Sequence, residues 1–248
     1  GLGDVYKRQM ADAEAAEYSN DVFSWASGYM YTAQELRRAA KAGLSLSVEK
    51  IMAVERAFKT KIQKTMMLGN SQIDLEGLIN ATGVTNTQAS APNSGTDRTW
   101  PGGDKTNDEI VYDITTLGSS AIRTRTYSQF GKSGLYVGLS QARYDFLANT
   151  RMASGTDTTI MQYILNNSES NGIEKFVVIH DLTDEGTGDS QLMVIYPKNK
   201  QVLEANIVDS IQWMPMQTKG LAFVFNGEME FGGVTIRYPV AMQQVYGI

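Results

Sequence analysis

Apolar side chains recur at intervals of three and four residues in one long segment of the chain, residues 47–68. A helix over this segment would carry them on a single face. They are Val48, Ile51, Val54, Phe58, Ile62 and Met66. Gly69-Asn70 follows as a break signal, and Ser47 stands at the start. The pattern predicts the longest helix of the chain over 47–68.

Shorter helices are predicted where a capping residue precedes an apolar period. Thr32 with Glu35 three residues on is a capping-box pattern, so a helix should run from there to Lys41 and end at Gly43. Thr106 is the expected cap of a helix within 105–123, and Ser140 that of a helix at 141–149. A further helix is predicted over 158–167.

The second half of the chain is dominated by strand patterns. The candidate strands are 21–32 (an extended arm or strand), 134–140, 175–180, 191–196, 201–205, 207–213, 220–226 and 228–238. Asn226-Gly227 is a two-residue hairpin signal between the last two. Helices come first and strands last, which predicts an α+β fold.

One long stretch, 81–104, carries no periodicity and is rich in Thr, Ser, Asn and Gly, with Pro92 and Pro101. Loops of this length are usually functional or linkers. The segment just before it, 72–80, is predicted as a short turn or helix.

Composition is that of a globular protein, and it removes several classes of function. The 248 residues suit one large domain or two intimate ones, with 42% hydrophobic and 20% charged residues. Cysteine is absent, so a disulfide frame, a thiolate nucleophile and a zinc–sulfur site are excluded. No run of apolar residues reaches the ~18 of a membrane helix.

Positive charge is concentrated in one segment. Residues 33–69 hold eight Lys or Arg against three Glu, a net +5, so the rest of a chain of net charge −5 carries −10. Lys50, Lys61 and Lys64 gather on one flank of the predicted long helix. We predict that this flank faces something anionic; a solvated helix face is the alternative.

Candidate catalytic chemistry is sparse. His180 is the only histidine, and the best acidic cluster follows it, comprising Asp181, Asp184, Glu185 and Asp189. Its spacing does not match an EF-hand loop, and there is no GxSxG, P-loop or GxGxxG motif. We therefore expect no enzyme activity, no cofactor and no metal. A hydrolase or small-molecule-binding domain that uses His180 and the acidic loop is the alternative of another class.

The first nine residues back-translate to a transposase-based sequencing adapter read in frame. We expect 1–9 to be an artefact of assembled environmental reads, with native sequence from near Met10 and an N-terminal segment missing.

Three segments in order resemble a known family. They are 28–80, with a long helix followed by Gly-Asn and a GLIN stretch; 100–114 (WPGGDKTNDEIVYDI) followed by GLYVGLSQARYDFL; and 232–248 (GGVTIRYPVAMQQVYGI). Together they are similar to the major capsid proteins of tailed bacteriophages, over about 10–248.

The resemblance implies the Hong Kong 97-type capsid fold, with a long spine helix, a peripheral β-sheet and an axial α/β domain. Mapped onto this chain, it places the end of an extended loop or arm at 10–32, and the peripheral domain at 33–104 with spine helix 47–68. The axial domain would be 105–219, and 220–248 would return to the peripheral domain.

The resemblance also implies a function. The chain would be a structural protein that self-assembles, through pentamers and hexamers, into the icosahedral shell of the virion around double-stranded DNA. Assembly would take place in the bacterial host cytoplasm. The basic flank would contact the packaged DNA non-specifically, and portal, scaffold, protease or decoration proteins are candidate partners, with no membrane. An encapsulin-like compartment shell is the alternative within the same fold.

Overall fold

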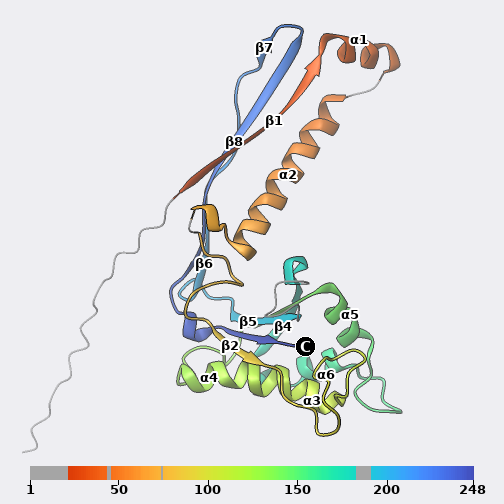
Figure 1. The fold of residues 1–248 in the computed structure, drawn as a ribbon, viewed down its shortest axis with the longest axis vertical. Helices are drawn as coiled ribbons and strands as arrows, with labels where there is room; N and C mark the ends of the chain where they lie inside the picture. Colours follow the sequence, from red (N-terminus) through yellow and green to blue (C-terminus); the bar gives the residue numbers. More distant parts are fainter. Residues whose placement is uncertain (1–21, 44–45, 74, 183–190) are drawn as a thin grey trace, which may run out of the picture.

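The computed structural model describes residues 22–43, 46–73, 75–182 and 191–248. They form an elongated unit above a compact unit (Figure 1). The predicted adapter residues 1–9, and the part of the predicted arm before residue 22, lie outside the described residues.

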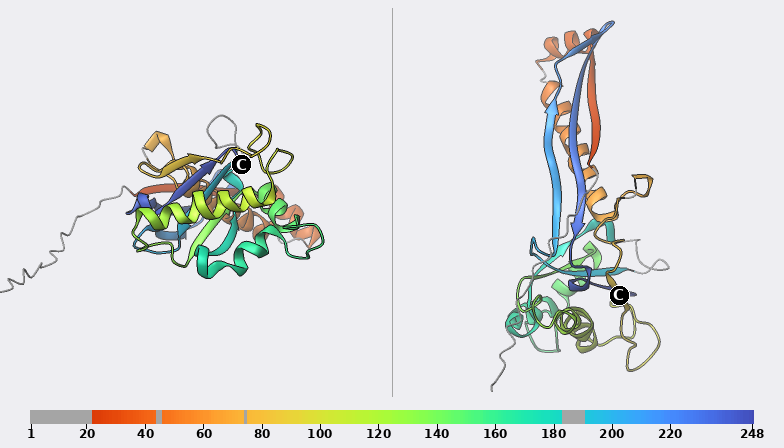
Figure 2. Two further views of the ribbon diagram at one scale, coloured as in Figure 1. Left: turned by 90° about the horizontal axis from the view of Figure 1, so that it is seen from below. Right: turned by 90° about the vertical axis from the view of Figure 1, so that its left-hand side faces the viewer.

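The elongated unit is a narrow antiparallel sheet with a long helix laid along it (Figures 1 and 2). Its strands follow the order β1-β8-β6, with β7 paired to the end of β8. The elements are β1 (Phe23–Thr32), α1 (Ala33–Ala42), α2 (Leu46–Leu68), β6 (Leu203–Trp213), β7 (Gln217–Lys219) and β8 (Ala222–Ile236). The longest helix is therefore the predicted one, one residue longer at its start.

The cap of α1 confirms the pattern read from the sequence. The Thr32 hydroxyl accepts from the Glu35 backbone N–H, and the Glu35 carboxylate accepts from the Thr32 N–H. The helix ends at Gly43, whose φ of 66° is the left-handed conformation that glycine adopts without strain.

The predicted hairpin turn at Asn226-Gly227 is wrong. Both residues lie inside β8, where Gly227 is opposite Ser27 of β1 and Trp213 of β6. A Cβ on Gly227 would lie 3.2 Å from the Trp213 ring, so the glycine makes room for this side chain. Strand pairing on both edges of β8 thus overrides the local turn preference. The hairpin turn forms at Gly220, between β7 and β8.

The apolar face of α2 is shifted from the predicted one. Val54 and Phe58 are buried as expected, but Thr65 is also buried, whereas Val48 is 52% exposed. Phe58 makes an edge-to-face contact with Trp25 at 4.7 Å between ring centroids. The resulting core is small: its buried residues are Val54, Phe58, Met229 and Phe231.

The compact unit is a mixed five-stranded sheet covered by short helices (Figure 1). Its strand order is β2-β9-β5-β3-β4. The strands are β2 (Thr85–Gln88), β3 (Leu135–Leu139), β4 (Ile173–Val178), β5 (Leu192–Pro197) and β9 (Gln243–Tyr246). The helices are α3 (Asn107–Tyr112), η2 (Asp113–Ser120), α4 (Ala121–Arg125), α5 (Gln141–Asn149), α6 (Ile160–Asn166) and α7 (Ser168–Asn171). Short 3₁₀ turns are η1 (Ser71–Ile73), η3 (His180–Leu182) and η4 (Pro239–Ala241).

Sheet membership departs from the predicted domain segments in three places, at β6, β9 and β2. β6, predicted within the axial segment 105–219, pairs with β8 in the elongated unit. β9, predicted to return with 220–248 to the peripheral domain, instead lies in the compact sheet between β2 and β5. The stretch 81–104 also contains a strand, β2, which pairs in parallel with β9. Such a pairing joins residues about 160 positions apart, and local sequence cannot specify it.

A continuous helix formed by α3, η2 and α4 runs across the compact unit (Figure 2). It begins at the predicted cap, Thr106, which forms a full capping box with Glu109. Its middle is π-helical, which the sequence pattern did not indicate. Gly118 lies in this part, where a Cβ would meet the terminal methyl of Ile195 on β5, so a larger residue would require that side chain to shift.

We expect Phe58→Ala to lower the free energy of unfolding of the elongated unit by about 3–5 kcal/mol, because it empties the centre of a small core. Met52→Ala, on the same helix but 58% exposed, is the control and should change it by less than about 0.5 kcal/mol. Denaturant unfolding followed by tryptophan fluorescence measures both. Equal effects of the two substitutions would contradict the packing of α2 described above.

Candidate functional site

The predicted basic flank of α2 contains one lysine that is bound within the subunit. The Lys50 ammonium donates to the Met30 carbonyl at 2.8 Å and lies 3.8 Å from the Glu35 carboxylate. It also lies 4.2 Å from the centroid of the Tyr31 ring. Lys50 therefore ties α2 to both α1 and β1.

The Met30 carbonyl belongs to the outer edge of the sheet. The Ala33 N–H donates to the Leu221 carbonyl, and these two residues continue the β1–β8 register beyond the pair Thr32–Ala222. Because hydrogen-bonded pairs alternate along antiparallel strands, the odd-numbered residues of β1 direct their backbone N–H and C=O groups toward β8. Met30 then directs its carbonyl outward, where Lys50 satisfies it. Lys61 is half-buried on the same flank and Lys64 is exposed, so these two are the cations of the flank that remain at the surface.

His180 is exposed at the start of η3, and Asp181 beside it is half-buried. The other members of the predicted acidic cluster, Asp184, Glu185 and Asp189, lie outside the described residues. Within the described ranges, no three His, Cys, Asp or Glu residues come together as metal ligands would.

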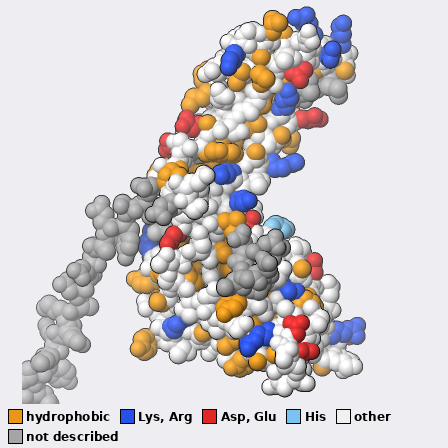
Figure 3. Space-filling view, viewed as in Figure 1, with side chains coloured by type: hydrophobic (Ala, Val, Ile, Leu, Met, Phe, Trp, Pro, Cys, Tyr) orange, Lys and Arg blue, Asp and Glu red, His pale blue; other side chains and the backbone are white. Residues whose placement is uncertain are grey.

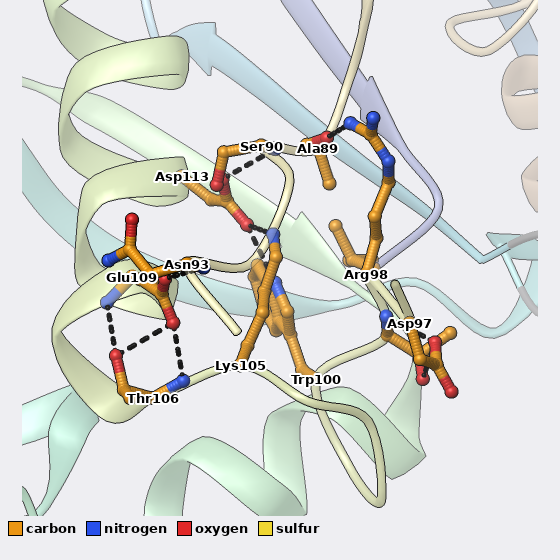
Figure 4. Close-up of polar contacts among 12 residues, drawn as sticks. Ala89, Ser90, Asn93, Asp97, Arg98, Trp100, Lys105, Thr106, Glu109 and Asp113 are labelled. Atoms are coloured by element: carbon orange, nitrogen blue, oxygen red, sulfur yellow. Dashed lines mark hydrogen bonds and ion pairs between the residues drawn. The ribbon is translucent and has the colours of Figure 1, made fainter. Parts of the chain in front are cut away.

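A buried ion pair lies in the compact unit (Figure 4). The side chains of Lys105 and Asp113 form this pair, and both are fully shielded from solvent. The Asp113 carboxylate also accepts from the Trp100 indole N–H at 3.1 Å and from the Ser90 backbone N–H at 3.0 Å. One carboxylate thus fixes two points of the segment 81–104, which the sequence predicted to be a loop, and also binds Lys105, which follows it.

A second carboxylate, from Glu109, fastens the same loop at the helix start. It accepts from the Thr106 backbone N–H at 2.7 Å and from the Asn93 backbone N–H at 2.6 Å (Figure 4). These hydrogen bonds, first of all that from Thr106, hold the pKa of Glu109 below its ordinary value. Nearby, Asp104 accepts from the backbone N–H groups of Thr96 and Asp97 at 2.8 and 2.9 Å.

Sequence reasoning missed this cluster. Asp113 was within a predicted helix and Lys105 at its edge, eight positions apart, and no short-range pattern pairs such residues. The motif WPGGDKTNDEIVYDI does contain Trp100, Lys105 and Asp113, but as part of a family resemblance only. The contacts of Asp113 and Glu109 hold the polar loop in place at one side of the compact unit.

Among the described residues, no helix is long and apolar enough to cross a membrane.

The fold is that of phage capsid subunits. The capsid of Myoviridae phage XM1 superposes with a TM-score of 0.75 at 16% identity, over 92% of this chain and 74% of that one. The capsid of an empty GTA particle gives 0.60 at 9% identity, over 96% and 78%. The holo-SrpI encapsulin complex of Synechococcus elongatus gives a lower 0.53 at 10% identity, over 92% and 74%.

The chain belongs to the major capsid protein family, whose sequence model matches residues 5–248. The predicted α+β capsid fold and the predicted family are therefore confirmed, and the chain is a structural subunit of a phage capsid. None of the proteins with curated functions matches it in sequence.

Lys105→Met should lower the free energy of unfolding of the compact unit by about 3–5 kcal/mol, because Asp113 is then a buried charge without a counter-ion. Adding Asp113→Asn removes that charge and should recover part of the loss. Chemical denaturation compares both single variants and the double variant with Lys132→Met, an exposed control. A double variant that loses the sum of the two single effects would show that the pair is not coupled.

Proposed function

We propose that copies of this chain assemble through five- and six-membered rings into an icosahedral shell that encloses phage double-stranded DNA. The observation that carries the proposal is the family match over almost the whole chain, together with the fold shared with the XM1 capsid. Assembly in the bacterial host cytoplasm, with portal, scaffold, protease or decoration proteins as partners, follows from the same family and is part of the proposal.

The shape of the subunit supports assembly. The elongated unit exposes large apolar side chains along its strands and hairpin: Ile207, Val208, Trp213, Met214, Met216 and Leu221. Exposed apolar surface of this extent is typical of a surface that another chain covers. In a closed shell each subunit meets several neighbours, so interfaces that are individually weak add up to a stable particle.

A structural role without catalysis is part of the same proposal. It is supported by the family, and by the way in which the buried polar groups of the compact unit are used to hold a loop.

Purified protein examined by negative-stain electron microscopy and native mass spectrometry is expected to show five- or six-fold rings or closed shells. Raising the ionic strength should alter the distribution if charged contacts contribute. A protein that stays monomeric at all concentrations and salt conditions would overturn the proposal.

We extend the proposal to the basic flank formed by Lys50, Lys61 and Lys64, which would face the enclosed DNA and contact phosphates without reading sequence. Because Lys50 is bound to Met30 and Glu35, the contact would rest mainly on Lys61 and Lys64.

Lys61→Glu/Lys64→Glu should weaken DNA binding and lower the slope of log affinity against log salt by about two, one phosphate contact for each lysine. Arg56→Glu/Lys59→Glu is the matched control, with the same charge change at two exposed positions outside this flank. DNA binding titrated at several salt concentrations, and DNA content per particle, are the measurements. Equal effects of the two pairs would contradict a DNA-facing flank.

A further inference from the structure

A tyrosine is held out from the compact unit on a strained turn. Tyr127 follows α4 and is 96% exposed, the highest exposure among the large hydrophobic side chains described. Tyr127 and Ser128 have φ angles of 49° and 59°, and they are the non-glycine residues with positive φ in the described structure. Two consecutive residues of this kind are disfavoured, and such strain persists only where surrounding contacts fix the backbone.

Hydrogen bonds fix this turn on both sides. The Ser128 N–H donates to the Arg123 carbonyl at 2.7 Å, and the Gln129 N–H donates to the Thr126 carbonyl at 2.9 Å. The Thr126 hydroxyl donates to the Ile122 carbonyl at 2.8 Å and accepts from the Phe130 backbone N–H at 3.4 Å. The backbone at Tyr127 is therefore fixed while its side chain projects into solvent, and an exposed tyrosine of this kind is suited to anchor a protein–protein contact.

The surroundings of this turn are basic. Gln129 and Phe130 line an open hollow together with Lys200, Arg237 and Tyr238, and no carboxylate lines it. Lys200 is exposed, while Arg237 pairs with Glu204 at 2.8 Å. We call this surface, Tyr127 with the hollow beside it, the basic end.

A hollow of the opposite charge lies at the other end of the same helix. It is lined by Ser90, Ala91, Asn93, Thr106, Asp108, Glu109 and Tyr112, with no cation among them. Asp108 is exposed and Tyr112 is 48% exposed. Its wall is rigid, because Glu109 binds the Asn93 backbone and Asp113 binds the Ser90 backbone (Figure 4). We call this surface the acidic end.

The two hollows lie near opposite ends of one helix. This helix, residues 107–125, runs across the compact unit (Figures 1 and 2) and is on the order of 25 Å long. A two-fold contact would place each surface against its own like-charged copy, which repulsion disfavours. The two surfaces can instead meet each other in a head-to-tail contact, and such contacts form a ring where the rotation between neighbouring copies closes.

We propose that the basic end of one copy docks on the acidic end of the next copy, with Tyr127 seated in the hollow that contains Asp108 and Tyr112. Lys200 then lies opposite Asp108 across the contact. Charge complementarity selects this partner and disfavours a contact between two like ends. The inference rests on the proposed function, since it names the surfaces by which the rings would close.

The first test compares assembly of Tyr127→Ala with that of Tyr163→Ala, a partly exposed tyrosine of the compact unit outside both ends. We expect the concentration needed for ring formation to rise at least tenfold for Tyr127→Ala and to stay within twofold for Tyr163→Ala. Asp108→Lys and Lys200→Glu should each weaken assembly, and the double variant should regain it. Circular dichroism melting verifies that each variant is folded.

The second test uses the absence of cysteine from the chain. Copies with Gln129→Cys, an exposed position of the basic end, mixed with copies carrying Ala91→Cys and oxidised, should form a disulfide-linked heterodimer in high yield. A mixture of Gln129→Cys with Tyr163→Cys should not.

Rings that form as readily with Tyr127→Ala as with wild type, together with no gain in the charge-exchanged double variant, would overturn this contact and leave the shell proposal standing. If the wild-type chain never assembles and the two cysteine variants give no cross-link, both this contact and the shell proposal are overturned.

Discussion

The elongated unit has very little interior of its own, and this constraint governs the rest of the structure. A narrow sheet covered by a single helix buries only the cluster around Phe58, Val54, Met229 and Phe231. β8 holds the unit together because it pairs with β1 on one edge and β6 on the other, and so joins the two ends of the described chain. A part with so little buried area leaves apolar side chains exposed, and neighbouring copies in a shell can cover them.

The compact unit, in contrast, has a large apolar interior of its own. Its sheet and helices enclose a large apolar cluster. The Asp113 carboxylate, with Lys105, Trp100 and the Ser90 backbone, converts a polar, proline-containing stretch into a fixed wall. A rigid wall loses little entropy when another surface docks on it, which suits an assembly built from many weak contacts.

Part of the positive charge of residues 33–69 is used in contacts within the subunit. The excess of lysine and arginine in residues 33–69 indicated one anionic partner, yet Lys50 is used to satisfy the carbonyl of Met30 at the sheet edge. A count of charged residues along the sequence therefore overestimates how many of these charges are available to a binding partner at the surface. Only the backbone register of β1 reveals that this carbonyl points outward and needs a donor.

The sequence by itself determined what depends on neighbouring residues. The capping boxes at Thr32 and Thr106, the end of α1 at Gly43 and the extent of α2 all follow from contacts within one turn, and the order of motifs was enough to indicate the family. Tertiary structure alone decided the rest. Asn226-Gly227 became strand because both edges of β8 are paired, β9 entered the compact sheet beside β2, and Lys105 met Asp113 in the interior. All three features depend on residues distant in the chain or on the exclusion of water from the interior. A local sequence pattern contains neither kind of information.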